Sequence, residues 1–204
     1  MNTITCLIFL IMKDRFDSVI SKYSSKILSC EDIFVIDYKN INGGNVDCLC
    51  ENPAFECVKI NNPNGIESYF ILFEDNCLEK AIGDYSKQCE CIAFPTEKHV
   101  KSWFLCIETK YSYSHENAFR EENNYPYIMI EKIKDTVAYF RERGVIDEKK
   151  RVTGIVSFPT LIGDFSESFK PKDESFEDIL INYNIIIRPT NKLKIISSKR
   201  LDFS

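Results

Sequence analysis

Short apolar runs separated by polar turns fill the first third of the chain and predict a strand-rich region. The runs have the length of buried strands and end at clusters of Asn, Gly and Pro, which are typical turn residues. We expect strands at residues 4–11, 33–38, 48–60 and 68–73. The first run is too short to cross a membrane and lacks the basic start and cleavage site of a secretory signal.

Two segments of the same region have a spacing that favours helices. Residues 15–27 predict a short helix, because their apolar side chains fall near one side of it, namely Phe16, Ile20, Tyr23 and Ile27. A second short helix is expected at residues 75–82.

The pattern of the second half is clearer. Apolar runs at residues 89–94 and 103–107 predict two strands, and the polar segment 112–124 predicts a loop. A crossover helix is expected at about 126–143, opened by Pro126 and ended by Gly144. Its apolar residues recur at helical spacing, at Ile130, Ile133, Val137 and Phe140. A further strand is expected at residues 151–158.

This order of elements indicates the fold class. Strand, strand, helix and strand in succession predict an α/β (α+β) protein with a central mixed β-sheet and a crossover helix on one face. Residues 161–177 form a connector, and final strands are expected at 179–187 and 193–196. We find no domain boundary, so residues 1–204 are predicted to form a single domain, with a strand-rich part (1–75), a core (76–160) and a C-terminal connector with strands (161–204).

Charge and cysteine content narrow the possible functions. A net charge of −5 argues against a protein that coats nucleic acid, although basic residues gather in 132–151 and 188–200, either to hold phosphates or as a solvated face. Nine cysteines without zinc-type spacing are expected to be small core residues of a cytoplasmic protein. A metal site at Cys48, Cys50 and Cys57 is the alternative.

Candidate chemistry lies at the ends of the two strands before the crossover helix. An acid two residues before a lysine occurs four times in the chain, and in Glu108–Lys110 it ends an apolar run. Side chains two apart on a strand share a face, and Glu90 on the preceding strand supplies a second carboxylate. Asp37 and Lys39 also end a strand and compete with this pair.

At these residues the chain resembles the PD-(D/E)xK superfamily, the nucleases with a restriction-endonuclease-like core, over about residues 77–158. In that family a carboxylate opens the second core strand, an acid-x-lysine triplet lies on the third, and a crossover helix leads to the fourth. The resemblance implies that Glu90 and Glu108 are metal ligands and that Lys110 is the catalytic lysine. It also implies that Glu79, on the helix expected at 75–82, is a further metal-binding acid. Glu90 stands where the family usually has Asp.

The function that the resemblance implies is a Mg²⁺-dependent nuclease, with Mn²⁺ as a substitute. Glu90, Glu108 and the carbonyl of Thr109 would hold the metal, and Lys110 would position the attacking water or stabilise charge on the phosphate. The implied partners are nucleic acid and a protein that assists in substrate choice, as in bacterial defence systems or a larger complex.

Other interpretations stay open. Glu108 and Lys110 would otherwise be an exposed ion pair at a strand end. The chain would otherwise be a non-catalytic interaction protein with a degenerate nuclease-like fold, docking through the connector residues Phe165, Phe169 and Phe176. Aromatic residues after the candidate site would either stack on bases or pack on the sheet, namely Tyr111, Tyr113, His115, Tyr125 and Tyr127. The sequence does not indicate an oligomeric state.

Overall fold

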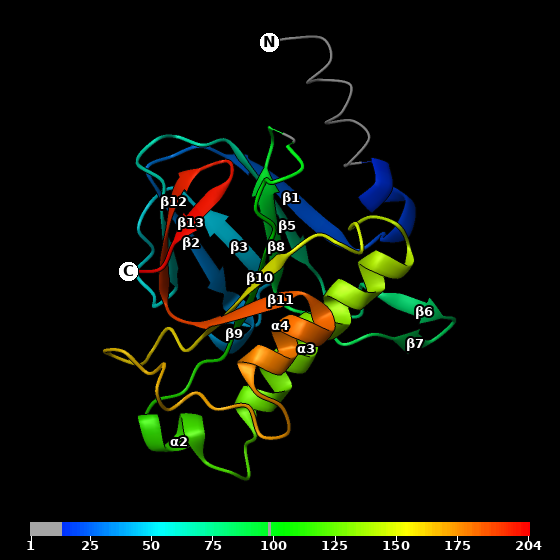
Figure 1. Cartoon of the computed structure of the whole chain (residues 1–204). Helices are drawn as coiled ribbons and strands as arrows, with labels where there is room; N and C mark the ends of the chain where they lie inside the picture. Colours follow the sequence, from blue (N-terminus) through cyan, green and yellow to red (C-terminus); the bar gives the residue numbers. More distant parts are fainter. Residues whose placement is uncertain (1–13, 98) are drawn as a thin grey trace.

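A six-stranded mixed sheet, here called the central sheet, runs through the middle of the molecule (Figure 1). This computed structural model describes residues 14–97 and 99–204. The strands, in spatial order, are β1 (Tyr23–Leu28), β5 (Ser68–Phe73), β8 (Cys91–Pro95), β9 (Leu105–Thr109), β10 (Val152–Ser157) and β11 (Ile185–Pro189). Neighbours from β1 to β9 are antiparallel, whereas β9, β10 and β11 are parallel. The expected mixed sheet in a single compact α+β domain is confirmed.

A second sheet of five strands packs against one face of the central sheet, and the sequence did not indicate it as a separate layer. Its order is β13 (Arg200–Asp202), β12 (Lys192–Ser197), β4 (Val58–Asn61), β2 (Asp32–Asp37) and β3 (Val46–Leu49). A one-turn 3-10 helix, η1 (Tyr38–Asn40), follows β2. A disulfide joins Cys30 to Cys50, so these two cysteines are not the free core residues that were expected.

The other face of the central sheet is covered by helices, so its middle strands are buried on both sides. Every residue of β5 is buried, because alternate side chains face opposite layers. Tyr69, Ile71 and Phe73 belong to the apolar cluster on the helix side, and Phe70 and Leu72 belong to the cluster between the two sheets. A strand buried on both faces reads as the continuous apolar run that the sequence shows.

Helix α3 (Tyr125–Glu142) is the crossover that joins β9 to the parallel strand β10, as predicted. Pro126 lies in its first turn, and Gly144 follows it with a φ of 67°. The helix comes close to the sheet over Gly154 of β10, where an added Cβ would lie 3.0 Å from two side-chain atoms of Ile133. Helix α4 (Phe176–Tyr183) lies beside α3 on the same side (Figure 1).

Two helix predictions were wrong in the first half. Residues 14–19 are helical, but the chain then enters β1. Of the four residues expected to share a helix face, only Phe16 and Ile20 are buried. Residues 75–82 do not form a helix, because Asn76 and Gly83 take positive φ values and turn the chain into a hairpin of β6 (Glu79–Ala81) and β7 (Asp84–Tyr85). The strand expected at 4–11 lies outside the described residues.

The C-terminal third also differs from the prediction. The segment expected as a strand at 179–187 is divided between α4 and β11, and the loop 112–124 contains the short helix α2 (His115–Phe119). The connector aromatics expected to dock to a partner are not available for it, since Phe165 and Phe169 are buried in the core and Phe176 packs against it. No helix among the described residues is long and apolar enough to cross a membrane.

Candidate functional site

Antiparallel pairing of β8 and β9 brings Glu90 and Glu108 to the same end of the central sheet. Glu90 immediately precedes β8 and Glu108 is the fourth residue of β9. The pairing of Cys91 with Ile107 places the start of β8 beside the end of β9, and the backbone N–H of Glu90 donates to the carbonyl of Ile107 at 3.0 Å. The two carboxylates that the sequence singled out therefore meet.

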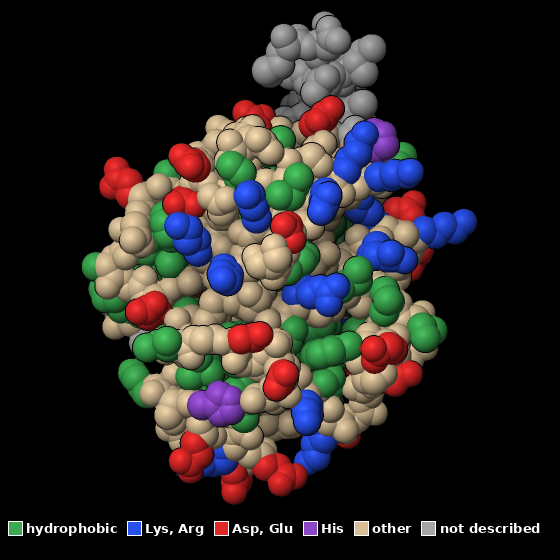
Figure 2. Space-filling view, turned by 60° about the vertical axis from the view of Figure 1, so that its left-hand side comes forward, with side chains coloured by type: hydrophobic (Ala, Val, Ile, Leu, Met, Phe, Trp, Pro, Cys, Tyr) green, Lys and Arg blue, Asp and Glu red, His purple; other side chains and the backbone are tan. Residues whose placement is uncertain are grey.

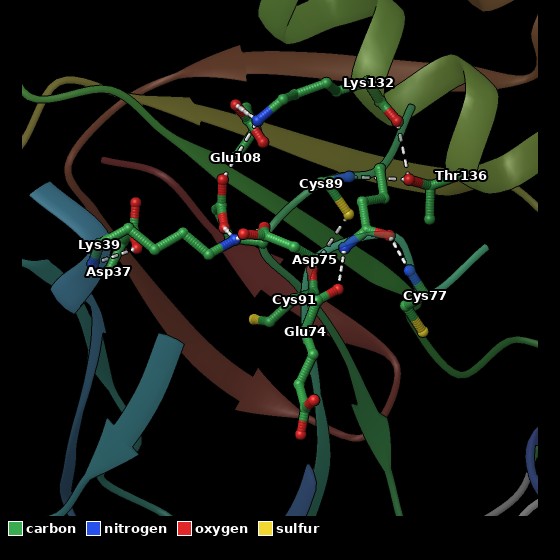
Figure 3. A network of polar contacts seen from close by, with 12 residues as sticks. Asp37, Lys39, Glu74, Asp75, Cys77, Cys89, Cys91, Glu108, Lys132 and Thr136 are labelled. Atoms are coloured by element: carbon green, nitrogen blue, oxygen red, sulfur yellow. Dashed lines mark hydrogen bonds and ion pairs between the residues drawn. The ribbon is translucent and has the colours of Figure 1, made fainter. Parts of the chain in front are cut away.

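Lys132 of α3 lies between these carboxylates. Its Nζ is 3.2 Å from Glu90 Oε1 and 2.8 Å from Glu108 Oε1, so one ammonium group bridges both acids. Figure 3 shows Lys132 reaching down from the helix toward Glu108. Both acids thus reach the helix side of the sheet, which alternation along β9 also predicts for Glu108. We call Glu90, Glu108 and Lys132 the carboxylate–lysine cluster.

Thr136 connects α3 to the segment that precedes β8. Its hydroxyl donates to the carbonyl of Lys132 at 2.7 Å, and it accepts the backbone N–H of Cys89 at 2.9 Å. Lys132 and Thr136 are polar residues four apart on a helix, next to the buried apolar residues Ile133 and Val137. Such a polar pair inside an apolar stripe was the sequence signal for Lys132, and the sequence analysis missed it.

Glu108 is a fully buried carboxyl group with one oxygen left without a hydrogen bond in the described structure. It is 0% exposed, and its Oε2 has no hydrogen-bond partner among the described residues. Burial, and then the charge of Glu90, raise the pKa of Glu108 well above its ordinary value against the opposing effect of Lys132. Burial lowers the pKa of Lys132, but the two carboxylates outweigh this and raise it. The ammonium group of Lys132 therefore stabilises the negative charge of the two carboxylates.

A second lysine reaches the cluster from the other sheet. Lys39 of η1 lies with its Nζ 3.4 Å from Glu90 Oε2 and 2.6 Å from Asp75 Oδ1. Its backbone N–H donates to Asp37 Oδ1 at 3.0 Å (Figure 3). Asp37 is buried at the end of β2, where burial and then Glu90 raise its pKa. Asp37 and Lys39, the alternative acid–lysine pair of the sequence, therefore lie beside the carboxylate–lysine cluster.

A cavity of about 330 Å³ opens beside the cluster. Glu90 and Lys132 line it, together with Lys39, Asp75 and residues 86–88. Glu108 is fully buried and does not line the cavity. A ligand that enters this cavity would meet Glu90 and the ammonium of Lys132 first.

The structure does not bring Lys110 and Glu79 to this place. Lys110 follows β9, and its Nζ lies 5.7 Å above the ring of Tyr125. Glu79 is exposed on the β6–β7 hairpin, where its carboxylate accepts the backbone N–H of Gly83 at 3.2 Å. The alternative of an exposed Glu108–Lys110 ion pair is also wrong, because Glu108 is fully buried and pairs with Lys132.

The aromatic residues after β9 do not gather into one surface. The hydroxyl of Tyr111 donates to the carbonyl of Glu56 at 2.9 Å, and Tyr113 is 94% exposed. His115 Nε2 lies 3.0 Å from Ser168 Oγ, on the connector. Tyr111 and His115 therefore each link two segments of the chain, and they do so at different places.

A divalent metal fits this site in part. Glu90 and Glu108 are ligands that Mg²⁺ prefers, and Glu108 Oε2 is a buried carboxylate oxygen without a partner in the described structure. However, no group of three or more His, Cys, Asp or Glu among the described residues is arranged to hold a metal ion. The cysteine alternative is also wrong, because Cys50 is disulfide-bonded and Cys48 instead shares a hydrogen bond with Cys91.

Comparison of the chain with protein-family models, with curated proteins and with solved structures found no match.

Proposed function

We propose that the chain is a Mg²⁺-dependent nuclease, with Mn²⁺ as a substitute, whose site is the carboxylate–lysine cluster. The order β8, β9, α3, β10, with a carboxylate at the start of β8 and another near the end of β9, supports a restriction-endonuclease-like core. The observation that carries the proposal is the convergence of Glu90 and Glu108 from neighbouring strands on one cation. Isolated buried carboxylates are costly, so a site of this kind is built for positive charge.

The protein side chains have separate tasks in this proposal. Glu90 and Glu108 would bind the metal with the carbonyl of Thr109, and Lys132 would have to release at least one carboxylate as the metal binds. The bound metal would polarise the scissile phosphate and favour deprotonation of a water. Lys132 lines the cavity beside Glu90, so it takes the role of positive charge near the phosphate that the sequence analysis gave to Lys110.

The test is cleavage of labelled DNA and RNA with Mg²⁺ by the wild type and by Glu108→Gln. The substitution keeps the shape of the side chain and removes the charge that a metal needs. We expect a loss of at least about 100-fold in rate, in the range seen when an electrostatic group of an active site is removed. Glu131→Gln, one residue before Lys132 on the same helix, is the matched control and should leave the rate unchanged. Equal rates for both variants and the wild type would contradict the proposal.

A comparison of two lysines sharpens the test. Lys110→Ala should lower the cleavage rate much less than Lys132→Ala, because, of these two lysines, Lys132 is the one that pairs with Glu90 and Glu108. Melting temperatures of both variants show whether a loss of rate is a loss of fold. A larger effect of Lys110→Ala in a folded protein would restore the role that the family resemblance implies.

The second candidate is a non-catalytic, nuclease-like interaction subunit. It is favoured by the position of Lys132, which already supplies a cation to both carboxylates, and by the complete burial of Glu108. In this case the lysine replaces the metal permanently. Mg²⁺ and Mn²⁺ would then leave the melting temperature of the wild type unchanged, whereas a nuclease that binds the metal in its folded state gains stability from it.

A further inference from the structure

A cavity of about 560 Å³ opens at the other end of the central sheet. Its walls come from residues 100–104 before β9, residues 149–151 and 153 at the start of β10, residues 184 and 186 at the start of β11, and residues 199–201 and 203 around β13. Phe104 and Glu108 are four residues apart along β9, which at strand spacing is about 13 Å. The cavity is therefore separate from the carboxylate–lysine cluster.

Every ionisable side chain that lines this cavity is basic. The six residues are Lys101, Lys149, Lys150, Arg151, Lys199 and Arg200. They make up six of the 26 Lys and Arg residues in a chain whose net charge is −5. Figure 2 shows Lys and Arg side chains gathered in the upper right part of the face it presents. Five of the six belong to the basic segments 132–151 and 188–200, which the fold brings to one place.

Two acidic residues next to the cavity in sequence, Asp147 and Asp202, attract Lys150 and Arg200 but form no ion pair with them in the described structure. The carboxylate of Asp147 accepts the backbone N–H of Lys149 at 2.8 Å, and Asp202 accepts the backbone N–H of Ser204 at 3.3 Å. None of the six basic side chains forms an ion pair with another residue of the described structure.

The contacts that do hold these side chains use neutral acceptors. Lys150 Nζ donates to the carbonyls of Val100 and Ser102, and Arg151 Nε donates to Asn184 Oδ1 at 3.3 Å. A carbonyl or amide oxygen orients a cation without cancelling its charge. The fold thus collects six like charges around one cavity, and an anion from outside would relieve their repulsion.

We propose that this cavity, the basic groove, binds the phosphate backbone of a nucleic acid. The groove is open and most of its cations are exposed at the rim, which suits a polymer of phosphates held by charge and not by a fixed pocket. Phe203 lines the same cavity and is only partly buried, with the guanidinium of Arg188 5.7 Å from its ring centre, so an aromatic face is present beside the cations. The proposal does not require the carboxylate–lysine cluster to be catalytic.

The test measures binding of short labelled oligonucleotides by fluorescence anisotropy in EDTA, over a range of NaCl concentrations. Single-stranded DNA, single-stranded RNA and duplex DNA are used in parallel to find which backbone the groove prefers. The test variant carries Lys149→Glu, Lys199→Glu and Arg200→Glu together, because these three side chains are exposed. We expect binding at least about 10-fold weaker and a salt dependence reduced by about two to three lost phosphate contacts.

The matched control reverses three exposed lysines that do not line the groove, Lys22→Glu, Lys80→Glu and Lys170→Glu. Both triple variants change the net charge by the same amount, so the control isolates position from bulk charge. It should bind within about twofold of the wild type, because charges beyond a Debye length are largely screened. Melting temperatures confirm that both variants are folded.

Three results would overturn the proposal. The first is absence of binding by the wild type at low salt, and the second is an equal loss in the two triple variants. The third is stronger binding of the wild type to vesicles of anionic phospholipid than to every oligonucleotide. Glu108→Gln should bind as the wild type does, so a failed nuclease assay and a failed binding assay point to different sites.

Discussion

The two ends of the central sheet handle charge in opposite ways. At the end of β9, Glu90 and Glu108 are buried and share the ammonium of Lys132. At the start of β9, six basic side chains surround an open cavity without an ion pair in the described structure. The charges at the end of β9 are paired with opposite charges of the protein, whereas the six basic side chains at its start form no ion pair in the described structure.

Because of this difference, we expect mutations at the two ends to affect different properties of the protein. A buried charge loses its water, so removing its partner is costly for folding. An exposed charge keeps its water, so removing it changes what the surface attracts and leaves the fold nearly unaffected. We therefore expect substitutions at the carboxylate–lysine cluster to act on stability, and substitutions in the basic groove to act on binding.

The largest effect on stability is expected for Lys132→Met. The change leaves Glu108 buried without its cation, and removal of one partner from a buried ion pair costs about 3–5 kcal/mol. Lys134→Met is the control on the same helix, since Lys134 pairs with Glu131 and Glu174, which are partly exposed, and should cost about 1 kcal/mol. Urea denaturation gives both values. Equal losses would mean that the cluster is not a special site.

Gly154→Ala should have the next largest effect, because it tests the close packing that holds α3 over the cluster. The new Cβ would lie 3.0 Å from atoms of both Ile133 and Ile187. Overpacking of this kind costs about 1–3 kcal/mol. A variant as stable as the wild type would show that α3 can move away from β10 without loss.

A pH dependence of stability should distinguish Glu108 from a surface acid. The pKa of Glu108 is raised in the folded state, so its carboxyl favours folding below its unfolded pKa and this contribution is lost as pH rises through the folded pKa. Relative to the wild type in EDTA, Glu108→Gln should therefore gain stability as pH rises above about 4.5, the ordinary Glu value. Thermal denaturation across pH measures the difference.

For Asp32 of β2, we expect the opposite dependence of stability on pH. Hydrogen bonds from Lys59 and Asn61 lower its pKa, so its contribution is present above its unfolded pKa and is lost as pH falls through the folded pKa. Asp32→Asn should lose a little stability at neutral pH and none in strong acid. The same sign for both variants would contradict the burial argument for Glu108.

The smallest effect is expected in the basic groove. Lys149→Gln removes an exposed charge from a set of like charges, so stability should stay within about 0.5 kcal/mol of the wild type. Urea denaturation checks this. A loss of more than about 1 kcal/mol would mean that Lys149 has a structural role and that the two ends are not as different as described.

Local patterns predicted the parts of the fold that depend on local sequence. Ser68–Phe73 shows in the sequence as a continuous apolar run, and the helix shows as Ile130, Ile133 and Val137 at helical spacing. The parallel strand after the helix follows from this order of elements. Glu90 and Glu108 could be paired because consecutive antiparallel strands place their adjoining ends together.

Long-range features could not be predicted in the same way. The second sheet joins β4 to β12, which are more than a hundred residues apart, and the hairpin at Glu79 depends on backbone turns at Asn76 and Gly83. Lys132 entered the site because α3 crosses directly over β9; the polar pair Lys132 and Thr136 marks a polar contact on that helix, but it does not show which strand the helix crosses. The basic groove likewise needed three strand ends brought together by the sheet.

Calorimetric titration of the wild type with Mg²⁺, and with Mn²⁺, tests the central claim most directly. If Glu90 and Glu108 form a cation site, the wild type gives saturable binding heat with either metal, and folded Glu108→Gln gives none. A folded wild type without metal-dependent heat would contradict the claim, and it would leave Lys132 as the permanent cation of the pair.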